Sequence, residues 1–299
     1  MQQFAQQILS RYPIRHKAKE KENMRHYLTG TCRALGYEAK LINRRRAFNV
    51  VVGDVEKAKV VFTARYATTL REPLPQFIAP TRPVTYFLYQ ALTPVAVLLL
   101  SFIVSFALTF AINRPTLTLP LFVALLVGAL VYLRFGPSET RTANDNTSGV
   151  AALLSVMESL TPRHRATAAF VFLDERGSKE LKKAYPSLRE KVVVNVECIG
   201  CGDEILMLPS KYTRWNGEFL DALTESFENT EEKSCFLKTD GLVYYPSENR
   251  AFRYNVAICA CKKVAGFGRF VKQHTNEIDE ENLEILRKGL VKLIEKATV

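Results

Sequence analysis

Short apolar segments alternate with amphipathic segments along most of the chain. Runs rich in β-branched and aromatic residues predict strands at 38–42, 48–53, 59–64, 168–173, 192–198, 205–208 and 256–260. Apolar residues at helical spacing predict helices at 150–160, 179–185, 218–227 and 280–296, and such spacing also recurs near the N-terminus. This alternation predicts an α/β fold with a mixed, mainly parallel β-sheet that is flanked by helices on both faces.

Two long uncharged runs interrupt this pattern. They cover residues 83–113 and 115–133, on either side of Arg114. A helix that crosses a bilayer needs about 20 mainly apolar residues, and both runs supply them. We therefore expect residues 83–135 to form a transmembrane helical hairpin. A buried helical pair in a soluble protein is the alternative, but the runs are long for core helices.

The remaining residues, 1–82 and 136–299, are expected to form one globular domain that the hairpin interrupts. The positive-inside rule then orients the protein. The turn between the two runs holds a single arginine, whereas basic residues flank the opposite ends of the runs at Arg82, Arg134 and Arg141. We expect a multi-pass protein of the cell membrane with two helices, a globular domain that faces the cytoplasm, and no signal peptide.

The chain is basic, with a net charge of +11. Its first 50 residues hold eleven Lys or Arg against three acidic residues, including the cluster Arg44-Arg45-Arg46. Such a surface suits nucleic acid or anionic lipid. No recognised nucleic-acid motif is present, so we expect the lipid bilayer, and no nucleic acid, as a partner. A solvated basic face is the alternative.

A polar loop with the sequence Asn-Asp-Asn-Thr-Ser-Gly, at 144–149, opens into a predicted apolar helix. These side chains suit a helix N-terminus, and that interpretation needs no further chemistry. However, Asp174 and Glu175 follow one predicted strand, Glu197 follows another, and His274 lies in a late polar loop. Because the carboxyl ends of strands in an α/β sheet line one crevice, these side chains are expected to converge.

This series resembles the family of co-catalytic zinc exopeptidases that includes bacterial di-zinc aminopeptidases, glutamate carboxypeptidases and the transferrin receptor. The 144–149 loop matches the loop that bridges two zinc ions in the family, and the Asp-Glu-Arg-Gly sequence at 174–177 matches its acid pair. The resemblance implies a three-layer sandwich fold and a general base at Asp174. It implies metal ligands at Asp145, Glu175, Glu197 and His274.

Two departures from the family pattern alter the expected site. Where the family has His-x-Asp after a strand, this chain has Arg65-Tyr66-Ala67, so the imidazole for the first metal and its supporting carboxylate are absent. Asp174 stands where the family has Glu and is one methylene shorter. A structural role for Asp174, paired with Arg176, is the alternative to a catalytic one.

Arg65 suggests what replaces the first metal. A guanidinium is always charged and binds carboxylates bidentately, so it could lie between Asp145 and Glu197 and exclude the first zinc ion. A solvated arginine at a strand end is the alternative. Asp145, Glu175 and His274 would still provide three ligands for a single zinc ion.

Two functions are therefore open. In the first, the protein is a membrane-anchored member of the family with little or no hydrolysis and a peptide or protein ligand, and it binds no zinc. In the second, it is an exopeptidase with one zinc ion, in which Asp174 takes a proton from a zinc-activated water. The residues determine neither the substrate nor the oligomeric state.

The chain has six cysteines, which we expect to be free thiols in the cytoplasm. Cys198 and Cys201 form a Cys-x-x-Cys directly after Glu197, and Cys259 and Cys261 form a second close pair. A thiolate zinc site or a redox pair is the alternative role for these four residues.

Overall fold

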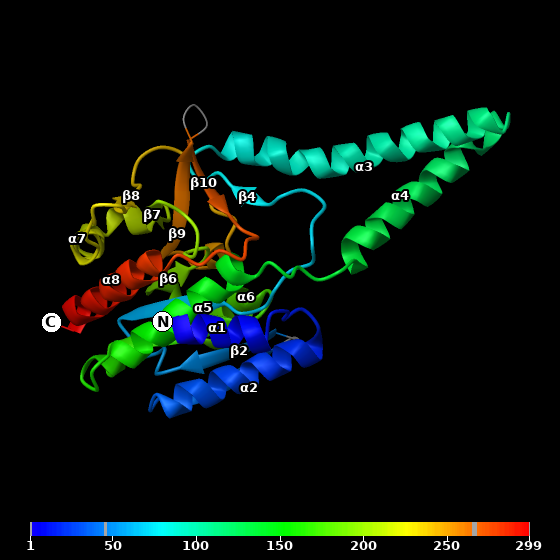
Figure 1. Ribbon diagram of the computed structural model, residues 1–299. Helices are drawn as coiled ribbons and strands as arrows, with labels where there is room; N and C mark the ends of the chain where they lie inside the picture. The colour runs from blue at the N-terminus through cyan, green and yellow to red at the C-terminus, as the bar shows by residue number, and fades with distance from the viewer. Residues whose placement is uncertain (1, 45–46, 265–267, 299) are drawn as a thin grey trace.

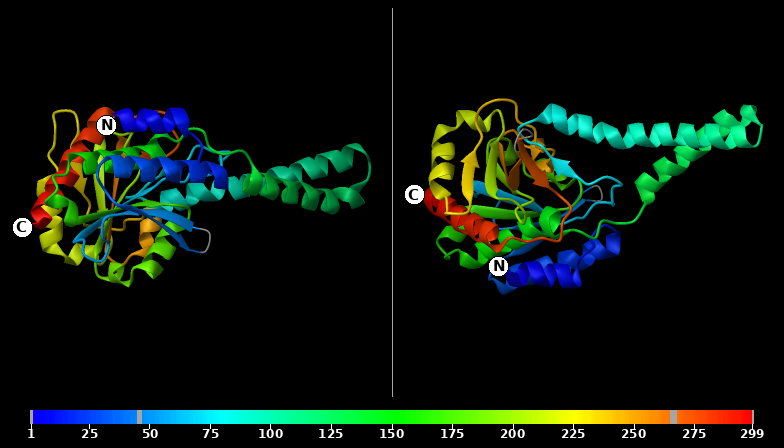
Figure 2. Two further views of the ribbon diagram at one scale, coloured as in Figure 1. Left: turned by 90° about the horizontal axis from the view of Figure 1, so that it is seen from below. Right: turned by 45° about the horizontal axis from the view of Figure 1, so that its top comes forward.

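The computed structural model describes residues 2–44, 47–264 and 268–298. It contains a mixed β-sheet with helices packed against it, and two long helices that project away from the sheet (Figure 1, Figure 2). Two members of the predicted basic cluster, Arg45 and Arg46, lie outside the described residues.

The described helices are α1 (Gln2–Arg11), α2 (Ala18–Ala34), α3 (Pro83–Ala111), α4 (Thr118–Phe135), α5 (Ser148–Ser159), α6 (Gly177–Ala184), α7 (Gly217–Ser226) and α8 (Glu280–Thr298). The described strands are β1 (Ala39–Arg44), β2 (Ala47–Val52), β3 (Val60–Arg65), β4 (Phe77–Ile78), β5 (Ala168–Leu173), β6 (Val192–Val196), β7 (Glu204–Pro209), β8 (Ser234–Leu237), β9 (Asn255–Val264) and β10 (Gly268–Lys272).

The centre of the sheet is parallel. There β5 pairs with β3, β3 with β6, and β6 with β9. The other strands pair mostly antiparallel. The β1–β2 hairpin joins through β2 to β5, and β7 and β10 both pair with the long strand β9. Strand β8 runs parallel to β7. The predicted mixed sheet is confirmed, with a smaller parallel part than expected. Because the central strands run the same way, their carboxyl ends meet at one edge.

Two apolar layers cover the faces of the sheet. Alternate side chains of a strand point to opposite faces, so Val50 and Phe62 join one layer while Val51 and Val61 join the other. Helices α1, α2, α5, α7 and α8 contribute to the first layer, and Leu181 of α6 contributes to the second. Helices on both faces of the sheet were predicted, and the two layers confirm them.

Three strands were not predicted from the sequence. Strand β4 has only two residues, β8 has four, and β10 carries Arg269 and Lys272. Short strands with exposed polar positions lack the alternation that identifies a half-buried strand. They acquire their structure from the neighbours with which they pair.

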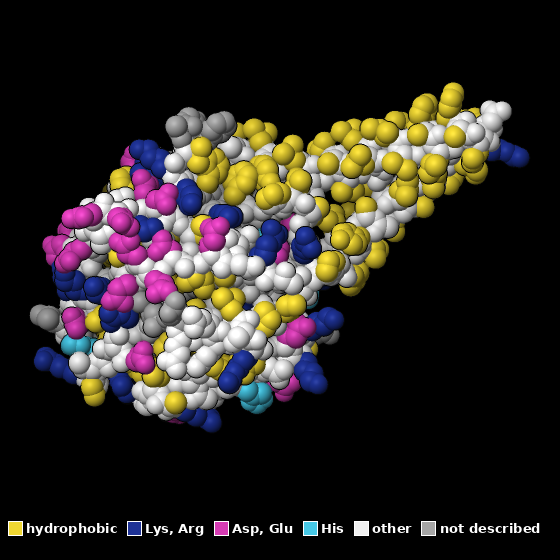
Figure 3. Space-filling model, in the orientation of Figure 1, with side chains coloured by type: hydrophobic (Ala, Val, Ile, Leu, Met, Phe, Trp, Pro, Cys, Tyr) yellow, Lys and Arg dark blue, Asp and Glu magenta, His cyan; other side chains and the backbone are white. Residues whose placement is uncertain are grey.

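Helices α3 and α4 form an antiparallel pair, here called the hairpin, that is long and apolar enough to cross a membrane. Their apolar windows have mean hydropathies of 2.4 and 2.3, and almost none of these residues is buried. Apolar side chains cover the visible side of the hairpin (Figure 3). A core pair of a soluble protein would be buried instead, so this exposure argues against that alternative.

The two helices meet along a stripe of small side chains. Ser101, Ser105 and Thr109 are the buried positions in the body of α3, four residues apart, and Thr109 shares a hydrogen bond of 2.7 Å with Thr118 of α4. Small and hydroxyl side chains at such spacing are typical of helix contacts in a bilayer, because they let the backbones approach closely.

Backbone hydrogen bonds pair the segment before the hairpin with the segment after it. The Arg71 amide donates to the Pro137 carbonyl at 2.9 Å, and the Glu139 amide donates to the Thr69 carbonyl at 3.0 Å. The two chain segments that enter and leave the hairpin are therefore held side by side. At the start of α3, the Tyr89 hydroxyl donates to the Pro75 carbonyl at 2.6 Å.

Candidate functional site

The polar loop forms a single π-helical turn, Ala143–Thr147, that is buried and leads directly into α5. Its side chains bind the backbone of other segments. Asn146 donates to the Ala67 carbonyl at 2.8 Å, just beyond β3, and Asn144 donates to the Lys272 carbonyl at the end of β10. The Ser148 hydroxyl accepts from the Ile199 amide at 3.0 Å, beyond β6. The loop therefore joins the carboxyl ends of three strands.

Gly149 allows α5 to approach the sheet. A Cβ atom at this position would lie 2.2 Å from the Val196 carbonyl oxygen, which is backbone and has no room to move. Only glycine fits, so the Ser-Gly end of the motif has a packing role that is independent of any chemistry.

Arg65 ends β3 and points at the loop. Its Nη2 donates to Oδ2 of Asp145 at 2.9 Å, and the Cys198 thiol donates to the other oxygen, Oδ1, at 3.6 Å. This contact agrees with one half of the expected position of Arg65 between Asp145 and Glu197, because the described hydrogen bond reaches Asp145. Burial disfavours the charge on Arg65, but the carboxylates of Asp145, Glu197 and Glu248 outweigh this effect and raise its pKa.

A second arginine supports the loop from the opposite side. Arg15 is fully buried, and its guanidinium donates to the Tyr66 carbonyl at 2.7 Å, to the Tyr12 carbonyl at 2.6 Å and to the Thr147 hydroxyl at 3.1 Å. Burial lowers its pKa to about 9, while the charge of Asp145 acts in the opposite direction. Arg15 therefore stays charged at neutral pH. No motif in the sequence distinguished it from the other basic residues near the N-terminus.

Glu197 follows β6 and shares this buried environment. Glu197 is 7% exposed, and its backbone amide donates to the Ile258 carbonyl at 3.2 Å. Burial raises the pKa of Glu197 to about 7; the charge of Arg65 lowers it and that of Asp145 raises it. Burial outweighs the opposing charge of Arg65, so Glu197 holds a proton for part of the time at neutral pH.

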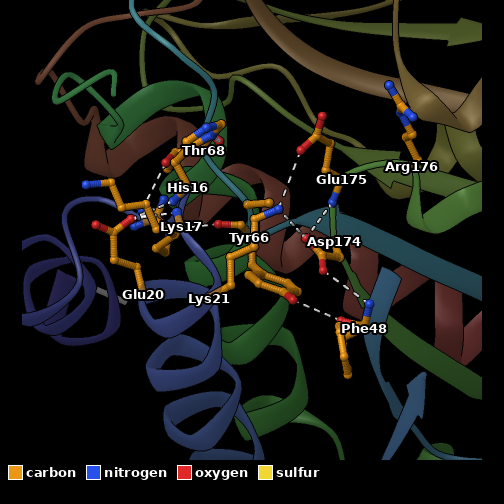
Figure 4. Close-up of polar contacts among 12 residues, drawn as sticks. His16, Lys17, Glu20, Lys21, Phe48, Tyr66, Thr68, Asp174, Glu175 and Arg176 are labelled. Atoms are coloured by element: carbon orange, nitrogen blue, oxygen red, sulfur yellow. Dashed lines mark hydrogen bonds and ion pairs between the residues drawn. The ribbon is translucent and has the colours of Figure 1, made fainter. Parts of the chain in front are cut away.

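Asp174 is fixed by three contacts (Figure 4). It pairs with Lys21 of α2 at 2.9 Å and accepts hydrogen bonds from the amides of Phe48 at 3.1 Å and Glu175 at 2.7 Å. Its ion-pair partner is Lys21 and not Arg176, which the sequence suggested. The backbone amide of Arg176 instead donates to Glu248. These contacts support the structural interpretation of Asp174.

Glu175 and His274 lie in different surroundings. The Glu175 side chain is 58% exposed and lies 3.5 Å from Lys21. His274 is nearly buried, and its Nδ1 has no hydrogen-bond partner among the described residues. The carboxylates of Glu72 and Glu139 lie within electrostatic reach of His274. The following residue, Thr275, is paired with Thr142, so the His274 segment runs beside the polar loop.

The predicted metal ligands divide into three groups, with Asp145 and Glu197 at Arg65, Glu175 at Lys21, and His274 near two other acids. Across residues 2–44, 47–264 and 268–298, no three or more His, Cys, Asp or Glu side chains are grouped so that they could hold a metal ion. A guanidinium has N–H donors and no lone pair for a metal, and here it occupies the Asp145 oxygen that a zinc ion would need. The arrangement at Asp145 therefore does not fit a zinc ion.

The four cysteines of the two close pairs are free and buried. Burial raises the pKa of Cys201 to about 11 and that of Cys261 to about 12, and the pKa values of Cys198 and Cys259 also rise well above the ordinary range. Thiols in this state are poor nucleophiles and poor metal ligands. The expectation of free thiols is confirmed.

Arg65 and Glu175 also line a cavity of about 410 Å³, here called the hairpin cavity. Its wall continues through the segment 67–73 to Thr93 of α3 and to Leu133 and Arg134 of α4. The carboxyl edge of the sheet therefore opens toward the base of the hairpin.

Solved structures of other proteins share the fold of this chain. No protein-family profile matches the chain, and no curated protein matches it in sequence. Among solved structures, a Zn-dependent exopeptidase from Parabacteroides distasonis superposes with a TM-score of 0.60 and 10% identity, over 97% of this chain and 95% of that one. The aminopeptidase LapA of Legionella pneumophila gives 0.55 and 11%, over 100% and 71%.

Glutaminyl cyclase from Porphyromonas gingivalis also superposes, with a TM-score of 0.56 and 11% identity, over 98% of this chain and 96% of that chain. Identities this low establish the fold alone. The chain has the fold shared by bacterial zinc-dependent exopeptidases, aminopeptidases and glutaminyl cyclases.

Proposed function

We propose that this protein is a membrane-anchored relative of the zinc exopeptidases in which an ion pair has replaced the first metal ion. It has little or no hydrolytic activity and binds a peptide or protein ligand at the carboxyl edge of its sheet. The hairpin crosses the bilayer, and the globular part, 1–82 with 136–299, faces the cytoplasm. Asp145 and Arg65 then have a structural role and a ligand-binding role, not a catalytic one.

The observation that carries this proposal is the hydrogen-bonded pair of Arg65 and Asp145. In the zinc exopeptidase family that the chain resembles, the aspartate that matches Asp145 bridges two zinc ions. It needs both carboxylate oxygens for that role. Here one oxygen accepts from Arg65 and the other from the Cys198 thiol. A buried carboxylate must be paired, and a guanidinium satisfies it without any metal.

Further observations support the loss of hydrolysis. The side chain at the family's base position, Asp174, is already occupied by Lys21 and two backbone amides. A general base needs a free lone pair within hydrogen-bond reach of the attacking water. Ala67 supplies no carboxylate to orient a ligand.

The membrane anchor is supported by the two exposed apolar helices and by charge. Arg114 lies in the turn between them, whereas Arg82, Arg134 and Arg141 lie at the opposite end. By the positive-inside rule this asymmetry places the globular part on the cytoplasmic side. A crevice that opens toward the hairpin base favours ligands close to the membrane surface.

A single-zinc exopeptidase is the second candidate, and one observation favours it. His274 Nδ1 is buried and has no partner in the described part of the chain, as a vacant imidazole ligand would be. That function requires Asp145 to release its hydrogen bond with Arg65 and to bind zinc instead. It also requires Glu175 to break its ion pair with Lys21.

Zinc content tests the proposal. We expect the purified full-length chain to hold well under one zinc per chain by elemental analysis. Arg65→His with Ala67→Asp should raise this value toward about one equivalent, because it restores an imidazole and its supporting carboxylate beside Asp145. Adding Asp174→Glu tests the base position. Arg71→His, which introduces a histidine elsewhere in the hairpin cavity, is the matched control and should bind no zinc.

Two outcomes would contradict the proposal. About one zinc in the unaltered chain, with chelator-sensitive release of N-terminal residues from peptides, would establish the second candidate. An equal gain of zinc in the Arg71→His control would mean that the residue assignment at Arg65 is wrong.

A further inference from the structure

The hairpin cavity lies at the depth of lipid headgroups if the hairpin spans a bilayer, as the proposed function holds. Helix α3 has 29 residues, more than the about 20 that cross a hydrocarbon core. Counting about 20 residues back from its far end at Ala111 reaches Leu92, next to the cavity residue Thr93. On α4, Leu133 and Arg134 belong to the last turn. Both helices therefore reach the cavity where they leave the hydrocarbon.

The exposed charges around the cavity favour an anion. Arg71 and Arg134 line it together with the acids Glu72 and Glu175, whereas the charge of Arg65 is already paired with Asp145. Glu175 is offset by Lys21 at 3.5 Å. Arg71 and Arg134 are both exposed, so they are positioned at the mouth of the cavity. An arginine fork matches the oxygens of a phosphate group.

The inner end of the cavity has unused hydrogen-bonding groups. Arg65 Nε and Thr69 Oγ1 are buried and have no partner in the described structure. A buried donor without a partner is costly. These two atoms have almost no exposed surface, so a ligand oxygen would reach them only after a small shift of the two side chains. The α4 side of the wall, by contrast, is apolar at Leu133. A ligand with an anionic head and an apolar body matches both sides.

We propose that the hairpin cavity binds the phosphate headgroup of an anionic phospholipid. Arg71 and Arg134 hold the phosphate at the mouth, and a shift of the Arg65 and Thr69 side chains would add hydrogen bonds from within. Bound lipid would thereby fix the orientation of the globular part over the bilayer. This inference rests on the membrane anchoring in the proposed function, and it adds a ligand that the fold comparisons do not suggest.

The test uses the full chain in mild detergent, with bound lipid counted by native mass spectrometry during titration with phosphatidylglycerol or phosphatidylcholine. We expect selective binding of phosphatidylglycerol. Arg71→Gln with Arg134→Gln should weaken it by roughly 30-fold, since each arginine near a lipid surface contributes about fivefold. Arg71→Lys with Arg134→Lys keeps the charges and should keep most of the binding.

Arg114→Gln is the matched control, because it removes one arginine at the opposite end of the hairpin. It should leave phosphatidylglycerol binding unchanged. Equal binding of both lipids, or the same loss in Arg114→Gln, would overturn the inference. Competition by millimolar inorganic phosphate would also overturn it, by identifying a soluble phosphate as the ligand. If the double glutamine variant does not fold, the single variants should each lose about fivefold.

A separate measurement distinguishes this inference from the function on which it rests. If alkaline carbonate releases the unaltered protein from membranes, the anchoring proposal is wrong and the inference falls with it. If the protein stays in the membrane but does not prefer the anionic lipid, only the inference is wrong.

Discussion

At the scale of single residues, the site is organised by buried carboxylates around Arg65, with the charge of Arg15 also acting on Asp145. Arg65 faces the carboxylates of Asp145, Glu197 and Glu248, and the only one of these to which it donates a described hydrogen bond is Asp145. Glu197 is buried beside this pair, and its pKa rises to about 7. A proton on Glu197 therefore removes one of the negative charges that Arg65 faces.

This balance predicts a pH-dependent stability. The folded-state pKa of Glu197 lies above the unfolded value of about 4.3, so the folded protein binds the proton more tightly. The contribution is fully present below about pH 4 and is lost as the pH rises toward 7. Glu197→Gln, which mimics the protonated form, should be more stable than the unaltered chain by about 2–4 kcal/mol at pH 8 and by only about 1 kcal/mol at pH 5.

Thermal unfolding of the full chain in detergent at the two pH values measures this difference. Glu190→Gln, at an exposed acid, is the control and should show no such dependence on pH. A constant difference between Glu197→Gln and the unaltered chain from pH 5 to pH 8 would contradict the charge balance.

At the scale of elements, the connection between the polar loop and α5 decides how the site is assembled. The π-helical turn uses its amide side chains to hold the ends of β3 and β10, and α5 then packs closely on the end of β6. A π-helical turn interrupts the regular hydrogen bonding of an α-helix, and such turns are often found at functional sites. Here it turns Asp145 toward Arg65.

Gly149→Ala tests this packing. The added Cβ would meet the Val196 carbonyl at 2.2 Å, so we expect a loss of about 2–3 kcal/mol or more in the free energy of unfolding. Gly30→Ala in α2 is the matched control, because nothing lies within 4 Å of its added Cβ. It should stabilise the protein by up to about 1 kcal/mol, since alanine favours a helix. Similar effects at both positions would show that the approach of α5 is not tight.

At the scale of the whole molecule, the hairpin is an insertion whose boundary differs from its apolar limits. The start of α3 and the end of α4 lie well apart from each other, and a loop joins the end of α4 to the globular part (Figure 1). Arg71 and Pro137, in contrast, are joined by a backbone hydrogen bond of 2.9 Å. The natural place to close the chain is therefore between these two residues.

Replacing residues 72–136 by two glycines should leave a water-soluble, folded domain. Two antiparallel segments can be joined by a two-residue turn, and the removed part contributes only the short edge strand β4 to the sheet. Circular dichroism and cooperative thermal unfolding without detergent measure the result. A two-glycine join that replaces 83–135 is the comparison and should fold less well. Aggregation of both proteins would contradict an inserted hairpin.

Much of the fold could be predicted from the sequence, because its signals are local. Strands β2, β3, β5 and β6 and helices α5 and α8 follow from apolar spacing within each segment, and the hairpin follows from the length of its uncharged runs. The polar loop was recognisable from six consecutive residues. Its pairing with Arg65 could be predicted because a carboxylate beside a missing imidazole still needs a cation.

The remaining features depended on contacts between distant parts of the chain. Asp174 is paired with Lys21, 153 positions away, and no pattern around Lys21 distinguishes it from its neighbours. The tertiary fold likewise brings the buried Arg15 to the polar loop, the Cys198 thiol to Asp145 and Glu248 to Arg65. Apolar periodicity determines which segments become helices and strands, since burial acts on each segment locally. Which charges meet at the carboxyl edge is decided only by tertiary packing, because each buried charge takes the partner that the strand order brings within reach.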